Sequence, residues 1–208
     1  MYVVGLIGPM GTGKSVVLEL LRELGAECLR ADDASRELLS KDMRLVSRVA
    51  ERLGSDLVRG DGSLDRARTA ALIFDSPDAR VQLEQIVHPP MLAWLRDHID
   101  ELRGRDHEPQ VAVVEAANLT QIGARELVDA VVRLEAPLNV CAERVQARDG
   151  VSLQQAMARL ELHRRLGLFT EPADHVLDTS GTMQQTHCRT RRLWQELLAQ
   201  ALQVSDEA

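Results

Sequence analysis

Short apolar runs alternate with segments of helical pattern along the whole chain. Three runs, at 2–7, 111–114 and 130–134, consist mainly of Val, Ile, Leu and Ala, and shorter ones stand at 27–29 and 176–178. Short runs of this composition are typical of strands buried on both faces. Strands that alternate with helices predict an α/β fold. We therefore expect a five-stranded parallel sheet with helices on both faces.

The segments between the apolar runs predict the helices. Apolar residues between 16 and 24 fall on one helical face, and Gly25 stands where a left-handed C-terminal cap belongs. Residues 43–103 have an almost continuous helical pattern, interrupted by turns such as Gly60–Gly62 and by Ser76-Pro77, where Ser caps and Pro opens a helix. This stretch predicts a helical insert at about 40–104 within a single domain.

Three further helices follow in the second half of the chain. Residues 138–148 and 152–166 form a helical pair, and Ser152 with Gln155 makes a capping box for the second helix. A closing helix is predicted for 183–202, with a frayed tail from Ser205. We expect another helix to start near Ala34, capped by Asp33.

Composition and charge exclude several classes of protein. The chain has 208 residues and a formal net charge of -7, which argues against nucleic-acid binding through phosphate attraction. Its apolar runs are too short to span a membrane, and the first residues lack the features of a secretory signal. Three widely spaced cysteines indicate neither disulfides nor a metal site. We expect a cytoplasmic protein without membrane or nucleic-acid partners, most simply a monomer.

The segment Gly8-Pro-Met-Gly-Thr-Gly-Lys-Ser15 has the spacing of a phosphate-binding loop and lies between a predicted strand and a predicted helix. Glycines allow backbone N–H groups to turn toward phosphates, and the helix N-terminus adds its dipole. Lys14 is expected to neutralise the β- and γ-phosphates of ATP, and the Ser15 hydroxyl to hold Mg²⁺. The residues expected to bind the nucleotide are Gly8, Gly11, Thr12, Gly13, Lys14, Ser15, Val16 and Arg144.

The scarcity of lysine supports the assignment of Lys14. Among 25 basic residues only Lys14 and Lys41 are lysines, and the others are arginines. A chain with this bias keeps a lysine where a compact ammonium must reach between phosphates, because the planar guanidinium does so poorly.

The remaining motifs favour a kinase over other proteins with this loop. The Asn-Lys-x-Asp segment of GTPases and the Leu-Ser-Gly-Gly signature of ABC ATPases are absent. A kinase needs an acid near the transferred group, which Asp32 or Asp33 can supply, and arginines over the phosphates, which Arg144 and Arg148 can supply. Each assignment has a plainer alternative, since Asp32 could cap a helix and a surface arginine pair could be solvated charge.

Four stretches together resemble the dephospho-coenzyme A kinase family. They are Gly5-Leu-Ile-Gly with the phosphate loop, Ala31-Asp32 with Arg36-Glu-Leu, the run from Asp61-Gly-Ser-Leu-Asp-Arg66 to His88-Pro89, and Arg148-Asp-Gly with Asp178-Thr-Ser-Gly181. The resemblance covers nearly the whole chain. It implies a nucleotide-binding core, a helical acceptor-binding insert and a lid at about 138–168.

The resemblance also implies an activity and residue roles. The activity is ATP-dependent phosphorylation of the ribose 3′-hydroxyl of dephospho-CoA. Asp32 matches the general base, with a possible water-mediated contact to Mg²⁺, and Arg148 matches a catalytic lid arginine. Arg66 and His88 fall in the acceptor-binding part, although His88 could instead end a helix before Pro89.

Several positions differ from the family pattern. Arg30 replaces an Asp, Val16 a Thr and Thr179 an Asn, while the segments 115–121 and 169–172 have different sequences altogether. These two segments lie on the acceptor and lid side, not on the triphosphate side. Two alternatives therefore stand beside the implied activity: a kinase of another nucleotide-like acceptor, and an ATP-binding regulator without transfer activity.

Overall fold

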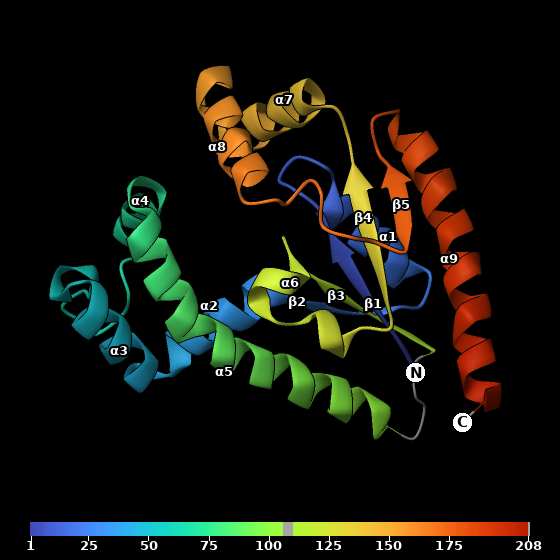
Figure 1. Ribbon diagram of the computed structural model, residues 1–208, viewed down its shortest axis with the longest axis horizontal. Helices are drawn as coiled ribbons and strands as arrows, with labels where there is room; N and C mark the ends of the chain where they lie inside the picture. The colour runs from blue at the N-terminus through green and yellow to red at the C-terminus, as the bar shows by residue number, and fades with distance from the viewer. Residues whose placement is uncertain (106–109, 208) are drawn as a thin grey trace. The chain divides into compact units, whose positions relative to one another are not determined.

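The computed structural model describes residues 1–105 and 110–207 and contains one five-stranded sheet (Figure 1). The spatial order of the strands is β2-β3-β1-β4-β5. Their bounds are β1 Tyr2–Ile7, β2 Glu27–Arg30, β3 Val111–Glu115, β4 Ala130–Glu135 and β5 His175–Asp178. β1 pairs in parallel with β3 and β4, and β4 with β5, so the predicted parallel α/β sheet is confirmed.

The helices occupy the segments between the strands. They are α1 Lys14–Glu23, α2 Ala31–Lys41, α3 Met43–Leu53, α4 Arg66–Asp75, α5 Pro77–Arg103, α6 Leu119–Ile122, α7 Leu138–Asp149, α8 Leu153–Arg165 and α9 Met183–Glu207, with short 3₁₀ turns at Ser55–Leu57 and Arg125–Leu127. The Ser152–Gln155 capping box of α8 is confirmed, because both of its reciprocal hydrogen bonds are present.

The strand register determines where functional groups meet. Leu6 of β1 lies opposite Glu115 of β3, and Ile7 opposite Arg133 of β4. The carboxyl ends of these three strands therefore share one edge of the sheet. Ligands of open α/β sheets bind outside this edge. Gly8 directly follows the last residue of β1, so the loop begins at this edge.

Apolar packing on both faces holds the sheet in place. On one face, Val17, Leu18 and Leu21 of α1 and Leu193, Trp194 and Leu197 of α9 pack against alternate strand residues. Burying one such Leu stabilises the fold by about 2 kcal/mol. On the other face α6 approaches β1 closely, because a Cβ added at Gly5 would lie 2.2 Å from Leu119 Cδ1. Gly5 therefore allows a helix to contact the central strand.

The chain forms two compact units. One comprises Met1–Leu29 and Ile99–Ala208, with the sheet and α1, and the other comprises Arg30–His98. The second unit has an apolar cluster of its own, built around Leu45, Val46 and Val49. It includes α2, which precedes the expected insert at 40–104, while the end of α5 belongs to the first unit.

Two local expectations, the cap at Asp33 and the frayed tail, are wrong, and so is the alternative left open for His88. Helix α2 begins at Ala31, so Asp32 and Asp33 lie within its first turn, and Asp33 pairs with Arg36 at 3.2 Å instead of capping. His88 does not end a helix, because α5 continues through Pro89 and Pro90. Buried Val87 and Met91 flank the prolines, and their packing offsets the hydrogen bonds that proline removes. The tail is helical through Glu207.

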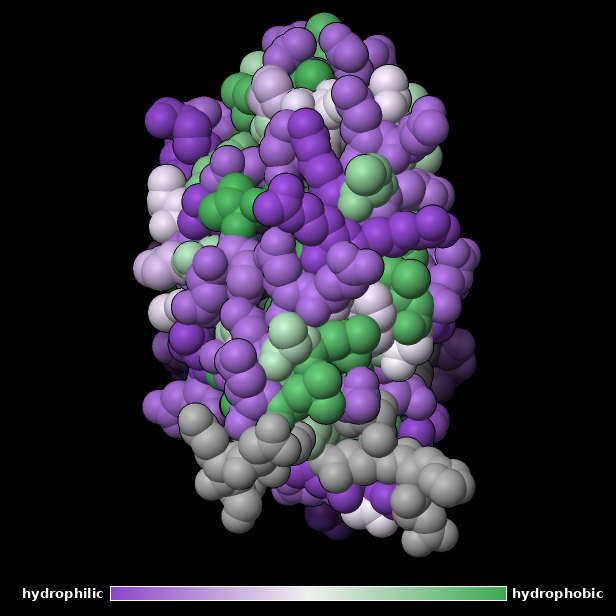
Figure 2. Space-filling view, turned by 90° about the vertical axis from the view of Figure 1, so that its right-hand side faces the viewer, coloured by the Kyte–Doolittle hydropathy of each residue, from purple (hydrophilic) through white to green (hydrophobic). Residues whose placement is uncertain are grey.

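Figure 2 shows a predominantly hydrophilic face with scattered apolar side chains. Within residues 1–105 and 110–207, no helix combines the length and the apolar character needed to cross a membrane.

Candidate active site

The loop between β1 and α1 has the backbone of a phosphate-binding loop. Gly8, Gly11 and Gly13 have φ angles of 145°, 80° and 85°, which residues with a Cβ rarely adopt. A Cβ added at Gly11 would lie 2.4 Å from the Cys141 carbonyl oxygen, whereas one at Gly13 would meet no atom within 4 Å. The loop is therefore packed against α7 at Gly11 and open at Gly13.

Lys14 is the first residue of α1, and its ammonium group lies within the loop. Lys14 Nζ donates hydrogen bonds to the carbonyl oxygens of Gly8 at 2.7 Å and Pro9 at 3.3 Å. It also lies 3.9 Å from Glu115 Oε1 at the end of β3. The positive charge is thus held at the mouth of the loop.

Glu115 is a site residue to which the sequence analysis gave no role. The residue as a whole is 8% exposed and lies at the carboxyl end of β3, the strand beside β1. The signal was present in the sequence, because an acidic residue ends the buried run 111–114. A buried carboxylate next to an ammonium keeps its charge compensated.

Two threonines connect the loop to the end of β5. Thr12 Oγ1 donates to the Pro9 carbonyl at 2.8 Å, and Thr179 Oγ1 lies 2.7 Å from the Thr12 carbonyl and 3.0 Å from the Glu135 carbonyl. Both threonines are 1% exposed. Thr179, noted in the sequence only as a difference from the family, thus ties the loop to β4 and β5.

The two arginines predicted to contact phosphates have different surroundings. Arg144 donates to the carbonyl oxygens of Gly11 at 3.3 Å and Thr179 at 2.7 Å, so it reaches the loop directly. Arg148 is 61% exposed and forms a two-pronged pair with Asp149, at 2.7 and 3.1 Å. Arg159 of α8 joins the same carboxylate at 3.1 Å. Hydrogen bonding from Arg148 lowers the pKa of Asp149.

Helices α7 and α8 pack on each other and on the loop. Their apolar cluster contains Cys141, Val145 and Leu160, and Met10 of the loop packs against it. His163 Nδ1 accepts a hydrogen bond from the Met10 backbone N–H at 3.3 Å. Burial, and secondarily the charge of Lys14, lower the pKa of His163 to about 4. The histidine is therefore neutral at neutral pH, as this acceptor role requires.

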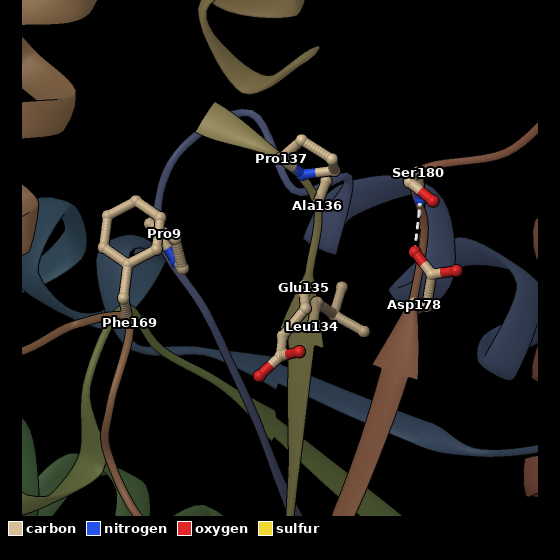
Figure 3. A pocket seen from close by; sticks show the side chains of 8 residues that line it. All are labelled: Pro9, Leu134, Glu135, Ala136, Pro137, Phe169, Asp178 and Ser180. Carbon is tan, nitrogen blue, oxygen red and sulfur yellow. Dashed lines mark hydrogen bonds between the residues drawn. The ribbon is translucent and has the colours of Figure 1, made fainter. Parts of the chain in front are cut away.

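A cavity of about 420 Å³ lies beside the loop (Figure 3). In Figure 3, Phe169 and Pro9 lie together on one side, and Asp178 and Ser180 lie on the other. The ends of β4 and β5 thus supply much of the wall. The residues lining the cavity are Pro9, Leu134, Glu135, Ala136, Pro137, Phe169, Asp178 and Ser180.

The two segments that differ from the family pattern are bonded to each other. Glu171 is 5% exposed, and its carboxylate accepts hydrogen bonds from the backbone N–H groups of Leu119 at 3.1 Å and Thr120 at 2.7 Å. Gln121 Nε2 donates to the Leu166 carbonyl at 2.8 Å. One buried carboxylate therefore caps α6 and joins 115–121 to 169–172.

The residues expected on the acceptor side belong to the unit Arg30–His98. Asp32 is exposed in the first turn of α2. Arg66 begins α4, with its guanidinium 3.5 Å from the Arg36 carbonyl, and His88 is half-buried in α5. Their roles remain predictions.

A glycine-rich loop that leads from a central parallel strand into a helix opening on Lys14 defines a P-loop nucleotide-binding protein. A family model for dephospho-CoA kinase matches residues 2–185. The chain belongs to the dephospho-CoA kinase family.

Curated relatives agree with this assignment, and solved structures share the fold. The chain is similar to dephospho-CoA kinases of Moorella thermoacetica, with 33% identity over 95% of this chain and 92% of the relative, and of Syntrophotalea carbinolica, with 35% identity over 89% and 87%. A crystal structure from Thermus thermophilus matches with a TM-score of 0.73 and 26% identity, over 96% of this chain and 97% of the other. Shikimate kinase from Acinetobacter baumannii, at a TM-score of 0.52 and 20% identity over 98% and 94%, shares the fold.

Proposed function

We propose that this chain transfers the γ-phosphoryl group of ATP to the ribose 3′-hydroxyl of dephospho-CoA, the final step of coenzyme A biosynthesis. The observation that carries the proposal is the loop Gly8–Ser15, with Lys14 held at its mouth, in a chain that matches the dephospho-CoA kinase family over residues 2–185. A monomeric, cytoplasmic enzyme is part of the same proposal.

The geometry of the loop fits a triphosphate. Open space at Gly13 leaves room beside the backbone, and the N-terminus of α1, with the positive end of its dipole, begins at the next residue. Lys14 Nζ can exchange its bonds to Gly8 and Pro9 for bonds to phosphate oxygens, because charged acceptors bind an ammonium more strongly than carbonyls do. The nucleotide roles proposed for Gly8–Val16 rest on this fit.

The residues present also fit a magnesium ion. Among residues 1–105 and 110–207 no group of three His, Cys, Asp or Glu side chains could form a metal site by itself. Ser15 is exposed on the first turn of α1 and Glu115 ends the neighbouring strand, so a hydroxyl and a carboxylate are available beside the phosphates. When bound, Mg²⁺ neutralises the charge that develops on the phosphate oxygens.

The chain's own residues would then divide the work of transfer. Lys14 holds the β- and γ-phosphates, Arg144 fixes the loop from α7, and Arg148 contributes a second positive charge from the proposed lid. Asp32 would accept the proton of the acceptor hydroxyl or hold a Mg²⁺-bound water. Arg66 and His88 are proposed to bind dephospho-CoA.

The test is a coupled assay of the purified protein with ATP, Mg²⁺ and dephospho-CoA. We expect ADP release that requires dephospho-CoA, together with a product carrying one additional phosphoryl group at the 3′ position by phosphorus NMR. Coenzyme A is the matched control, because its 3′-hydroxyl is already phosphorylated. Transfer only to a different nucleotide-like acceptor would mean that dephospho-CoA is not the substrate. Tight ATP binding without any transfer would mean that the protein is an ATP-binding regulator.

A further inference from the structure

His163 makes a hydrogen bond that has no part in the proposed phosphoryl transfer. The backbone N–H of Met10, third residue of the phosphate loop, donates to His163 Nδ1 at 3.3 Å. The bond joins α8 to a loop residue that lies 153 positions earlier in the chain. The positive charge of Lys14 acts on the same imidazole.

Further contacts fix the same part of the loop. The Met10 side chain packs against the cluster of Cys141 and Leu160, and Arg144 donates to the Gly11 carbonyl. A Cβ at Gly11 would collide with the Cys141 backbone, whereas Gly13 has open space around it. Helices α7 and α8 thus hold Met10 and Gly11, while the Gly13 part stays accessible to phosphate.

We propose that His163 is a positioning residue, which holds the Met10–Gly11 part of the phosphate loop in its nucleotide-binding conformation and keeps this bond when nucleotide is bound. The proposal rests on the proposed function only as far as the loop binds ATP. It gives α8 a second role beside that of a lid, because the helix also forms part of the wall that shapes the loop.

The chemistry of the bond restricts which side chains can replace histidine. An acceptor needs a lone pair on Nδ1, so the ring must be neutral with its proton on Nε2. Asparagine can place its Oδ1 where Nδ1 stands, because both atoms are attached to Cγ. Alanine removes the acceptor and leaves the Met10 N–H without this partner.

The experiment compares ATP and ADP affinity by calorimetry for wild type, His163→Ala and His163→Asn. Loss of one hydrogen bond predicts a roughly 3- to 10-fold weaker affinity for the alanine variant. The asparagine variant should bind within about twofold of wild type. His175→Ala is the matched control and should bind as wild type does, because this half-buried histidine lies on β5 near Gln200 and Glu196 of α9.

Hydrogen exchange at the Met10 amide provides a readout that a general loss of stability would not reproduce. Exchange should be faster in His163→Ala than in wild type and slow again in His163→Asn, relative to the amides of β1. Tighter ATP binding by the alanine variant would overturn the proposal, since it would mean that His163 competes with the nucleotide. Unchanged affinity and unchanged Met10 exchange in that variant would also overturn it.

The same measurements separate this inference from the proposed function. Nucleotide binding requires neither the acceptor nor transfer. If the wild-type protein binds ATP but does not phosphorylate dephospho-CoA, the kinase proposal fails and the His163 results still stand. If His163→Ala proves unstable, the affinity and Met10 exchange of His163→Asn decide, and values far from wild type in that variant contradict the acceptor role.

Discussion

Lys14 and Glu115 form a mostly buried ion pair at the carboxyl edge of the sheet. Lys14 Nζ lies 3.9 Å from Glu115 Oε1, and the two side chains are only 15% and 11% exposed. The pair joins the first residue of α1, at the end of the loop, to the last residue of β3. One cation and one anion are thereby placed where phosphate and metal charges would meet.

The first prediction concerns Lys14. Lys14→Ala should lower phosphoryl transfer by about a hundredfold or more at saturating ATP, because the ammonium stabilises charge that grows in the transition state. Lys41→Ala is the control: Lys41, the only other lysine, is exposed and pairs with Glu37. Steady-state turnover measures both. If Lys14→Ala keeps more than about a tenth of wild-type turnover, a loss of under roughly 1.4 kcal/mol, the role of Lys14 is wrong.

The second prediction concerns Glu115. Glu115→Gln keeps the shape of the side chain and removes its charge. The Mg²⁺ concentration needed for half-maximal turnover should therefore rise several-fold, which corresponds to a loss of about 1 kcal/mol or more in the free energy of Mg²⁺ binding. Glu115→Asp retains the charge, and its Mg²⁺ requirement should lie between those of wild type and Glu115→Gln. Turnover titrated with Mg²⁺ is the measurement. An unchanged Mg²⁺ requirement in Glu115→Gln would restrict Glu115 to its pairing with Lys14.

Local signals in the sequence predict the sheet and the loop well. The strand runs are short and apolar, and the loop glycines with positive φ, Gly8, Gly11 and Gly13, stand at motif positions, so local chemistry determines both. The Ser152–Gln155 box is equally local. Such features follow from neighbours within a few residues.

The contacts that complete the site depend on residues far apart in the chain. Thr179 reaches Thr12, His163 reaches Met10 and Glu171 reaches α6, and each pair is separated by 51 positions or more. No periodicity or motif in one sequence marks such pairs. The cap expected at Asp33 failed for a related reason, because α2 begins directly at the end of β2 and leaves no linker for a cap.

The third prediction tests the connection made by Glu171. Glu171→Gln replaces one acceptor oxygen by an amide N–H₂ that faces the backbone N–H groups of Leu119 and Thr120. We expect the free energy of unfolding to fall by roughly 1–3 kcal/mol, the cost of unsatisfied buried polar groups. Urea unfolding measures it. Glu196→Gln, at an exposed pair with Arg192, should change stability by less than about 0.5 kcal/mol.

The fourth prediction is a pH dependence of stability. The pKa of His163 is about 4 in the folded protein, below the usual 6.5, because of burial first and Lys14 second. Between these two values the unfolded chain binds a proton that the folded chain does not. Stability should therefore rise with pH through this window, with a contribution of at most roughly 3 kcal/mol that is complete above pH 6.5 and lost as the pH falls toward 4.

Urea unfolding at about pH 5 and about pH 7.5 measures this contribution. Lys14 of α1 is the charged group that acts on the ring, whereas Glu161, Arg164 and Arg165 on α8 pair with one another. His163→Asn does not titrate and should show a smaller difference in stability between the two pH values. An equal difference in wild type and variant would mean that other groups cause it.

The last prediction separates a kinase from a protein that only binds ATP. Asp32 and Asp33 are adjacent in the first turn of α2, and both are exposed, yet only Asp32 is proposed as the general base. Asp33 already pairs with Arg36 at 3.2 Å. Asp32→Asn should leave ATP affinity within a few-fold while transfer to dephospho-CoA falls by roughly 10²- to 10⁴-fold, the contribution of a positioned base. Asp33→Asn, a substitution of the same size and charge, should change transfer little. Turnover and calorimetric ATP affinity, measured on both variants, distinguish binding from chemistry. Near wild-type turnover in Asp32→Asn would show that Asp32 is not the general base. An equal loss of transfer in both variants would indicate that the negative charge at the α2 N-terminus matters, and not the position of Asp32.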